Sequence, residues 1–185
     1  MKKFLRISYI VFVVFLMTEL LPKRSFALDG IEFFTGFSQS KLREKGNYRM
    51  IPLMVDFNFD IKPEKFSRIF QFQIEPFISP VYEPNPNVEV GVAGLIKVGI
   101  LPKDYAIQPY FKIGVGLDYM TQRVVEESTQ LNFIEYGVVG VSYALTKNTS
   151  LAIEGRFRHL SNADLGDKNL GINSTFILAG IGYRF

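Results

Sequence analysis

The sequence contains no cysteine and only one histidine among its 185 residues. The absence of cysteine excludes a disulfide framework and a cysteine-based metal site. A single histidine cannot supply the ligand set that zinc usually takes. We therefore expect neither a metal nor any other cofactor.

A basic domain and a second long apolar run are also missing. Residues 1–27 carry five Lys or Arg and one Glu, a net charge of +4, whereas the whole chain carries +3. Residues 28–185 therefore have a net charge of −1, which gives no reason to expect nucleic acid as a partner. No apolar stretch after residue 27 is long enough for a membrane helix. If this part of the chain lies in a membrane, it must do so as a closed barrel.

The first 27 residues have the features of a cleaved secretory signal peptide. Three basic residues within the first six precede the apolar run ISYIVFVVFLM, and SFA at 25–27 fits a small-residue cleavage site. The run has about 11 residues, which is too short to span a bilayer as a helix. Lys23 and Arg24 lie unusually close to the expected cut, so a membrane-anchored N-terminus is the alternative. We expect residues 28–185 to form the mature domain.

Apolar and polar residues alternate with period two throughout residues 28–185, as in FQFQIEPFI at 70–78, and this pattern predicts β-strands. Large apolar residues share one face of each segment, and charged residues and glycines share the other. The expected strands are 31–38, 51–61, 70–78, 88–100, 107–119, 133–143, 149–159 and 175–185. In a membrane barrel the polar face fills the lumen. The charged residues on that face are Glu75, Glu89, Lys97, Lys112, Asp118, Glu154, Arg156, Arg158 and Arg184.

The links between these segments alternate strictly between long and short. The long links are expected at 38–50, 79–87, 120–132 and 160–174, and the short ones at 62–65, 101–105 and 145–148. Long external loops and short periplasmic turns are typical of outer-membrane barrels. The last residue, Phe185, also resembles the terminal signal of bacterial outer-membrane proteins. We predict an all-β, eight-stranded antiparallel transmembrane barrel in the bacterial outer membrane; a secreted lipocalin-like barrel is the alternative.

The only histidine, His159, lies two residues before Ser161 at the end of the seventh expected strand. Both share the parity of the apolar residues of that strand, so both are expected to face lipid at the outer leaflet. Residues two apart on a strand project to the same side, roughly 6–7 Å apart at the backbone. This spacing lets a histidine act as general base for a hydroxyl nucleophile. Spacing alone is also compatible with an interfacial histidine followed by Ser-Asn turn chemistry.

The stretch HLSNADLGDKNLGIN, which begins at His159, resembles the lipid A deacylase (PagL-type) family of outer-membrane enzymes. The family pattern is His-x-Ser-Asn followed by Asn-x-Gly on the last hairpin. The resemblance is strongest over residues 156–176 and extends more loosely over the expected barrel, in its length, strand number and terminal Phe. It implies hydrolysis of the ester-linked 3-hydroxyacyl chain at position 3 of lipid A, the membrane anchor of lipopolysaccharide, without metal or cofactor.

The resemblance also implies a role for each matching residue. Ser161 would be the nucleophile, and His159 its base and later the acid for the leaving group. Asn162 and Asn169 match polar residues that lie near the oxyanion. Gly171 would allow a tight backbone on the same side.

The position that matches the family's acid, typically a glutamate, is Asn173 in this chain. It shares the outward parity of its strand and could reach His159. An asparagine can hold one imidazole tautomer, but it does not stabilise an imidazolium as a carboxylate does. Asp164 and Asp167 in the preceding loop could substitute, although both are also expected as solvated loop residues.

The sequence also bears on one pair of acidic residues, on a non-catalytic role and on the oligomeric state. Glu126 and Glu127, in the link at 120–132, are expected to be solvated surface residues. A non-catalytic barrel with a structural or surface-binding role is the alternative to the enzyme. The oligomeric state is left open, and a homodimer is compatible with the sequence.

Overall fold

The structure, a computed structural model, describes residues 27–61 and 67–185. The expected signal peptide, apart from its last residue Ala27, and the whole of the expected short link at 62–65 lie outside these residues. In the part of the chain that is described, no helix has the length and apolar character needed to cross a membrane.

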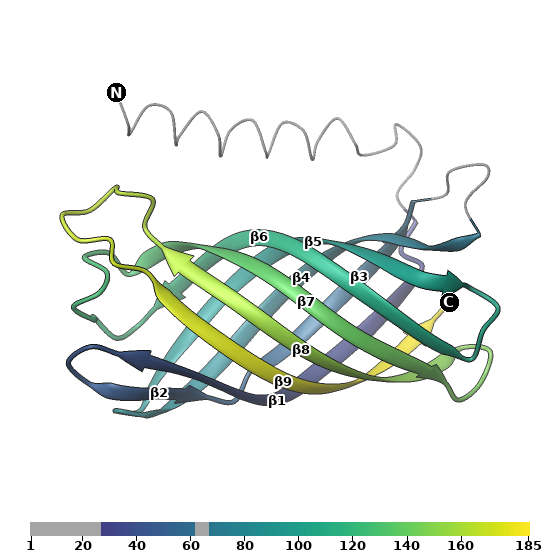
Figure 1. The fold of residues 1–185 in the computed structure, drawn as a ribbon, viewed down its shortest axis with the longest axis horizontal. Helices are drawn as coiled ribbons and strands as arrows, with labels where there is room; N and C mark the ends of the chain where they lie inside the picture. The colour runs from purple at the N-terminus through teal and green to yellow at the C-terminus, as the bar shows by residue number, and fades with distance from the viewer. Residues whose placement is uncertain (1–26, 62–66) are drawn as a thin grey trace.

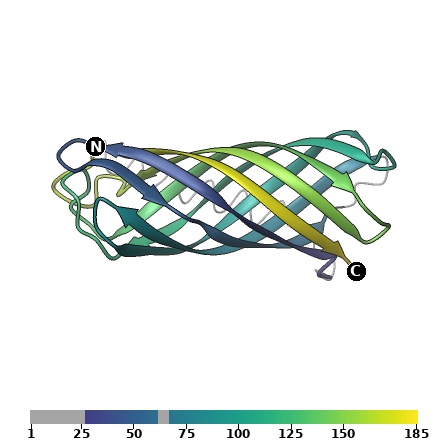
Figure 2. The ribbon, with the colours of Figure 1, turned by 90° about the horizontal axis from the view of Figure 1, so that it is seen from below.

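The described residues form one antiparallel sheet that closes on itself (Figure 1). Its strands are β1 (Gly30–Leu42), β2 (Gly46–Met50), β3 (Leu53–Asp60), β4 (Arg68–Glu83), β5 (Asn87–Pro102), β6 (Ile107–Met120), β7 (Leu131–Ala144), β8 (Thr149–Ser161) and β9 (Ile172–Arg184). Closure comes from the pairing of β1 with β9, which lie side by side in Figure 2. The predicted all-β antiparallel barrel is confirmed, and closure leaves no free sheet edge.

The structure has nine strands where the sequence predicts eight, because one barrel position is interrupted. Along the same edge, β1 pairs with β3 through residues 30–35 and with β2 through residues 38–42. The break between β2 and β3 falls at residues 51–52, and Pro52 has no N–H to give to the ladder. The two short strands therefore occupy one of eight positions around the barrel.

The predicted strict alternation of long and short links is wrong. In place of the long link at 38–50, β1 and β2 continue as a hairpin with a turn at residues 43–45. In place of the link at 79–87, β4 and β5 extend until only residues 84–86 separate them. Strand pairing continues past the apolar alternation, because backbone hydrogen bonds do not require apolar side chains. The long links that remain are 121–130 and 162–171, which lie at the same end of the barrel as the 43–45 turn (Figure 1).

The two faces of the wall have opposite chemistry, as the alternation predicts. Large apolar side chains are exposed on the outer face, among them Phe111, Ile113, Val139 and Ile177. An exposed apolar belt of this kind suits contact with lipid.

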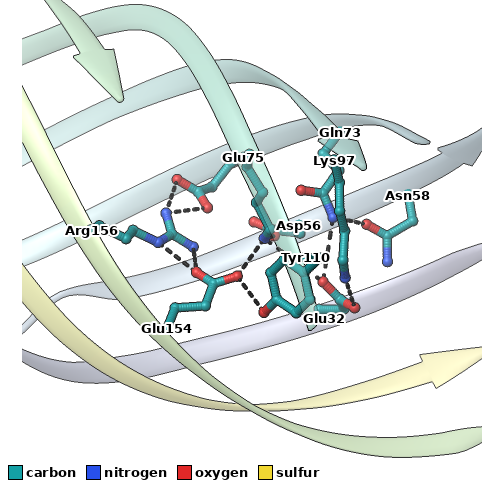
Figure 3. A network of polar contacts seen from close by, with 10 residues as sticks. Glu32, Asp56, Asn58, Gln73, Glu75, Lys97, Tyr110, Glu154 and Arg156 are labelled. Carbon is teal, nitrogen blue, oxygen red and sulfur yellow. Dashed lines mark hydrogen bonds and ion pairs between the residues drawn. The ribbon is translucent and has the colours of Figure 1, made fainter. Parts of the chain in front are cut away.

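The predicted lumenal ion-pair network is present and buried (Figure 3). Arg156 pairs with Glu75 at 2.7 Å and with Glu154 at 2.6 Å, and Lys112 bonds to Glu154 at 2.7 Å. Each of these four buried charges thus has a partner of opposite sign, which offsets its desolvation. The prediction is wrong for Arg184, which is exposed at the end of the barrel, where it pairs with Asp60.

Candidate active site

The candidate site lies where β8 ends and β9 begins, at the end of the barrel that has the long links. Antiparallel pairing sets His159 of β8 directly opposite Asn173 of β9. On its other side His159 is opposite Glu135 of β7, and Ser161 is opposite Phe133. The His159 and Ser161 side chains are half-buried and lie on the outer face, as their parity predicts.

A short hydrogen bond joins His159 to the residue at the family's acid position. The distance from His159 Nδ1 to Asn173 Oδ1 is 2.7 Å, and Asn173 is exposed. An amide oxygen only accepts, so with this oxygen facing the ring the hydrogen is on Nδ1 and Nε2 is the basic nitrogen. Among the described contacts His159 makes no hydrogen bond to Ser161, and such bonds often tighten only when substrate is bound.

Gly171 packs against the imidazole ring. Its φ is +74°, a backbone conformation that favours glycine. A Cβ atom at this position would lie 2.6 Å from His159 Cε1. Glycine is therefore required here for two separate reasons, its backbone conformation and the space that the ring occupies.

The two asparagines predicted near the oxyanion hold the 162–171 loop together in this structure. Asn162 Nδ2 donates to the backbone oxygen of Lys168 at 2.7 Å. Asn169 Nδ2 donates to Asp164 Oδ1 at 2.8 Å, and Asn169 Oδ1 accepts from the Asn162 N–H at 3.1 Å. Asp167 is exposed. These contacts give the loop a fixed internal framework, and the oxyanion role of the two asparagines stays a prediction.

Sequence reasoning missed a carboxylate at this site, and its expectation for Glu126 and Glu127 is wrong. Both are buried, with 4% and 2% of their surface exposed. Glu127 Oε1 accepts from the Gly171 N–H at 2.8 Å, and Glu127 Oε2 accepts from the Asn162 N–H at 3.0 Å. Burial raises the pKa of the Glu127 carboxyl, and these two N–H groups act in the opposite direction.

The two long links pack together, and this packing buries the two glutamates. A β-bridge joins Glu127 to Asn169, and the Leu170 N–H donates to the Glu126 backbone oxygen at 2.9 Å. The only local signal of burial is the apolar pair before the glutamates, of which Val124 is buried. That signal does not say which loop covers them.

Among the described residues no metal cluster marks the site, and a cavity in the barrel lies elsewhere. In residues 27–61 and 67–185 no group of three or more His, Cys, Asp or Glu side chains is placed to hold a metal ion. A cavity of about 180 Å³ lies at the opposite end of the barrel, lined by residues such as Lys103, Tyr105 and Asn148. The candidate site is instead an open position on the outer wall.

The sequence matches one family model, described as lipid A 3-O-deacylase (PagL), over residues 53–182. This range includes His159, Ser161 and Asn173 together with β3 to β8 and most of β9. No curated protein matches the chain.

Several solved structures resemble the barrel. Neisserial surface protein A (NspA) is 14% identical with a TM-score of 0.66, and the match covers 88% of this chain and 100% of that one. The outer membrane enzyme PagL is 17% identical with a TM-score of 0.60, covering 82% and 97%. The N-terminal β-barrel domain of Pseudomonas aeruginosa OprF is 9% identical with a TM-score of 0.50, covering 85% and 98%. At these identities the likeness shows a shared fold.

Proposed function

The chain belongs to the lipid A 3-O-deacylase (PagL) family, and we propose that it performs the family's reaction with Ser161 and His159 on the outer face of the barrel. The protein is an outer-membrane β-barrel and an ester hydrolase. The observation that carries the residue assignment is the 2.7 Å contact between His159 Nδ1 and Asn173 Oδ1. His159 lies two residues before Ser161 on the same face of β8. This contact leaves Nε2 as the base on the face that carries the serine.

The proposed reaction proceeds through an acyl-enzyme. His159 Nε2 takes the proton of Ser161 Oγ as that oxygen attacks the carbonyl carbon of the ester at position 3 of lipid A. The tetrahedral intermediate collapses, the bond to the sugar oxygen breaks, and His159 gives its proton to that oxygen. Water, deprotonated by His159, then attacks the carbonyl carbon of the acyl-serine, the bond to Ser161 Oγ breaks, His159 returns the proton to that oxygen, and the 3-hydroxy fatty acid leaves. Asn173 holds the Nδ1–H throughout both steps.

Several of the predicted oxyanion donors are bonded to other protein groups in this structure. The predicted donors come from Asn162, Asn169 and Gly171. In this structure the donors with described bonds contact protein acceptors. The backbone N–H groups of Asn162 and Gly171 would have to change partner to reach a developing oxyanion, whereas the Asn169 side-chain amide has a second N–H hydrogen to donate.

The position of the site suits a substrate that is already in the outer leaflet. Phe157 and Leu131 are exposed on the outer wall near Ser161, and Phe133 lies directly opposite it on β7. Acyl chains of lipid A can lie along such an apolar surface while the sugar stays at the level of the loops. Lipid A is therefore the proposed partner. A homodimer has no support among the comparisons and is not part of the proposal.

Mass spectrometry of lipid A from living cells tests this function. We would compare cells that carry the parent gene, no gene, or the Ser161→Ala form, with folded protein confirmed in the outer membrane. Loss of one 3-hydroxyacyl chain with the parent gene alone is the expected result. Unchanged lipid A in all three would favour the non-catalytic barrel, whose behaviour does not depend on Ser161.

A further inference from the structure

One buried carboxylate holds both ends of the loop that joins β8 to β9. Glu127 accepts the N–H of Asn162, the residue after the proposed nucleophile, at 3.0 Å. It accepts the N–H of Gly171, which packs on the imidazole ring of His159, at 2.8 Å. No other carboxylate among the described hydrogen bonds joins these two backbone segments.

Starting from the proposed function, we propose that Glu127 is the positioning carboxylate of this site. It fixes the backbone on both sides of the His159–Ser161 pair. It also supplies the negative charge that the neutral side chain of Asn173 does not give to the imidazolium.

The positioning role follows from where the two N–H groups lie. A shift of Gly171 would move the backbone that contacts His159 Cε1, and a shift of Asn162 would move the end of the strand that carries Ser161. A carboxylate that accepts both N–H groups couples the two movements, because one side chain fixes two backbone segments. The β-bridge between Glu127 and Asn169 holds the carboxylate's own backbone against the same loop.

The electrostatic role follows from distance and burial. Gly171 separates Glu127 from the imidazole, and its contacts to each limit the carboxylate–ring separation to roughly 8 Å. With 2% of its surface exposed, Glu127 is little screened by water. The pKa of its carboxyl is raised by burial, and the charge of His159 is among the effects that lower it. At this separation, the negative charge of Glu127 and the positive charge of the imidazolium attract each other.

The elements packed around His159 bring Asn173, Glu135 and Glu127 into its neighbourhood. Asn173 on β9 is neutral and bonds to His159 directly. Glu127 is linked to His159 through Gly171, whose N–H it accepts. Glu135 on β7 is its cross-strand partner, but Glu135 is exposed and makes no hydrogen bond to His159 among the described contacts. Exposure weakens the effect of a charge, so Glu127 is the stronger source.

Glu126 provides a matched control. It is the neighbouring residue, it is also buried, and its carboxylate also accepts a backbone N–H. That N–H belongs to Arg43, in the turn between β1 and β2, and not to the β8–β9 loop. Glu126→Gln therefore repeats the loss of a buried charge in the same loop and leaves the bonds to Asn162 and Gly171 intact.

The first experiment follows the titration of the imidazole by NMR in the purified full chain. Because His159 is the only histidine, its ring signals need no assignment. Glu127→Gln should lower the pH at which the signals titrate by about one unit, the effect of removing one charge at this distance. Glu126→Gln should leave that pH within about 0.3 units of the parent value. Glu127→Asp, which keeps the charge, should titrate close to the parent.

The second experiment measures kcat and KM on lipid A in mixed micelles. Glu127→Gln should lower kcat by about 10- to 100-fold with little change in KM, because the single oxygen of the Gln amide can replace only one of the two carboxylate oxygens that accept the Asn162 and Gly171 N–H groups. Glu126→Gln should stay near the parent. The heat-modifiable gel mobility of barrels verifies that each variant is folded.

The outcomes separate this proposal from the proposed function. An unchanged titration in Glu127→Gln, or activity that rises in it, would overturn the positioning role; a rise would mean that the carboxylate competes with the oxyanion. A shifted titration with an inactive parent would overturn the hydrolase and leave the Glu127–His159 coupling in place. If Glu127→Gln does not fold, Glu127→Asp is compared with Glu126→Gln. Glu127→Asp keeps the charge, so a His159 titration lowered by about one pH unit in it would count against the proposal.

Discussion

Asn173→Asp places a carboxylate on the imidazole without changing the shape of the side chain. The two residues have the same number of heavy atoms, and Asn173 Oδ1 already lies 2.7 Å from His159 Nδ1. The variant therefore exchanges a neutral hydrogen bond for a charge-assisted one at the same position. It should strengthen the interaction when the imidazolium forms, which is the moment when the serine proton has been taken.

The size of the effect follows from the exposure of Asn173. A neutral hydrogen bond contributes about 0.5–1.5 kcal/mol and one to a charged group about 1.5–3 kcal/mol, so a buried site would gain about 1–1.5 kcal/mol. Asn173 is exposed, which reduces the gain to about 0.5–1 kcal/mol. The variant should therefore raise kcat/KM by about two- to fivefold. In a Glu127→Gln background the gain should be larger, because the imidazolium then has no other buried negative charge near it.

The assay is the release of 3-hydroxy fatty acid from lipid A, measured as kcat/KM at fixed pH and salt. Thr175→Asp is the control, because Thr175 is the next exposed residue on the same face of β9 and its cross-strand partner is Phe157. It adds the same charge without a contact to His159. A value for Asn173→Asp at or below the parent, with both variants folded, would refute the role of Asn173 as the residue that orients and stabilises the ring.

Two further predictions test the site backbone and the lumen. Gly171→Ala should lower kcat at least about tenfold and leave the barrel folded, because its Cβ would lie 2.6 Å from His159 Cε1 in a strained backbone. Kinetics measure the first effect and heat-modifiable gel mobility the second. A kcat like that of the parent would contradict the close packing of Gly171 on the ring. Arg156→Leu should lower the free energy of unfolding by about 3–5 kcal/mol, since it leaves Glu75 buried without its cation. Arg184→Leu, at an exposed pair, should cost less than about 1 kcal/mol, so equal urea midpoints for the two variants would contradict the buried network.

Much of the site follows from local sequence. The period-two alternation predicts that His159, Ser161 and Asn173 project from the outer wall, and the structure has each of them on that side. Of the nine charges that the same alternation places in the lumen, only Arg184, at the barrel end, reaches solvent. Parity can be read from sequence because a strand turns successive side chains to opposite faces, whatever its neighbours are.

The lumen also contains partners that pattern reading overlooked. Glu32 bonds to Lys97 at 2.6 Å, and Asp56 bonds to Lys112 at 2.7 Å, although neither acid is among the predicted network members. The strands that carry them are distant in sequence from those of their partners. Which charge meets which across the lumen depends on the register of the closed sheet.

The sequence by itself therefore determined the barrel, its two faces and the residue types of the proposed pair. Only the tertiary structure decided that Asn173 reaches Nδ1 and that Glu127 closes the loop between β8 and β9. The first outcome rests on alternation, a property of neighbouring residues in one strand. The second rests on the register of β8 against β9 and on the packing of two loops about 40 residues apart, which the closure of the barrel brings together.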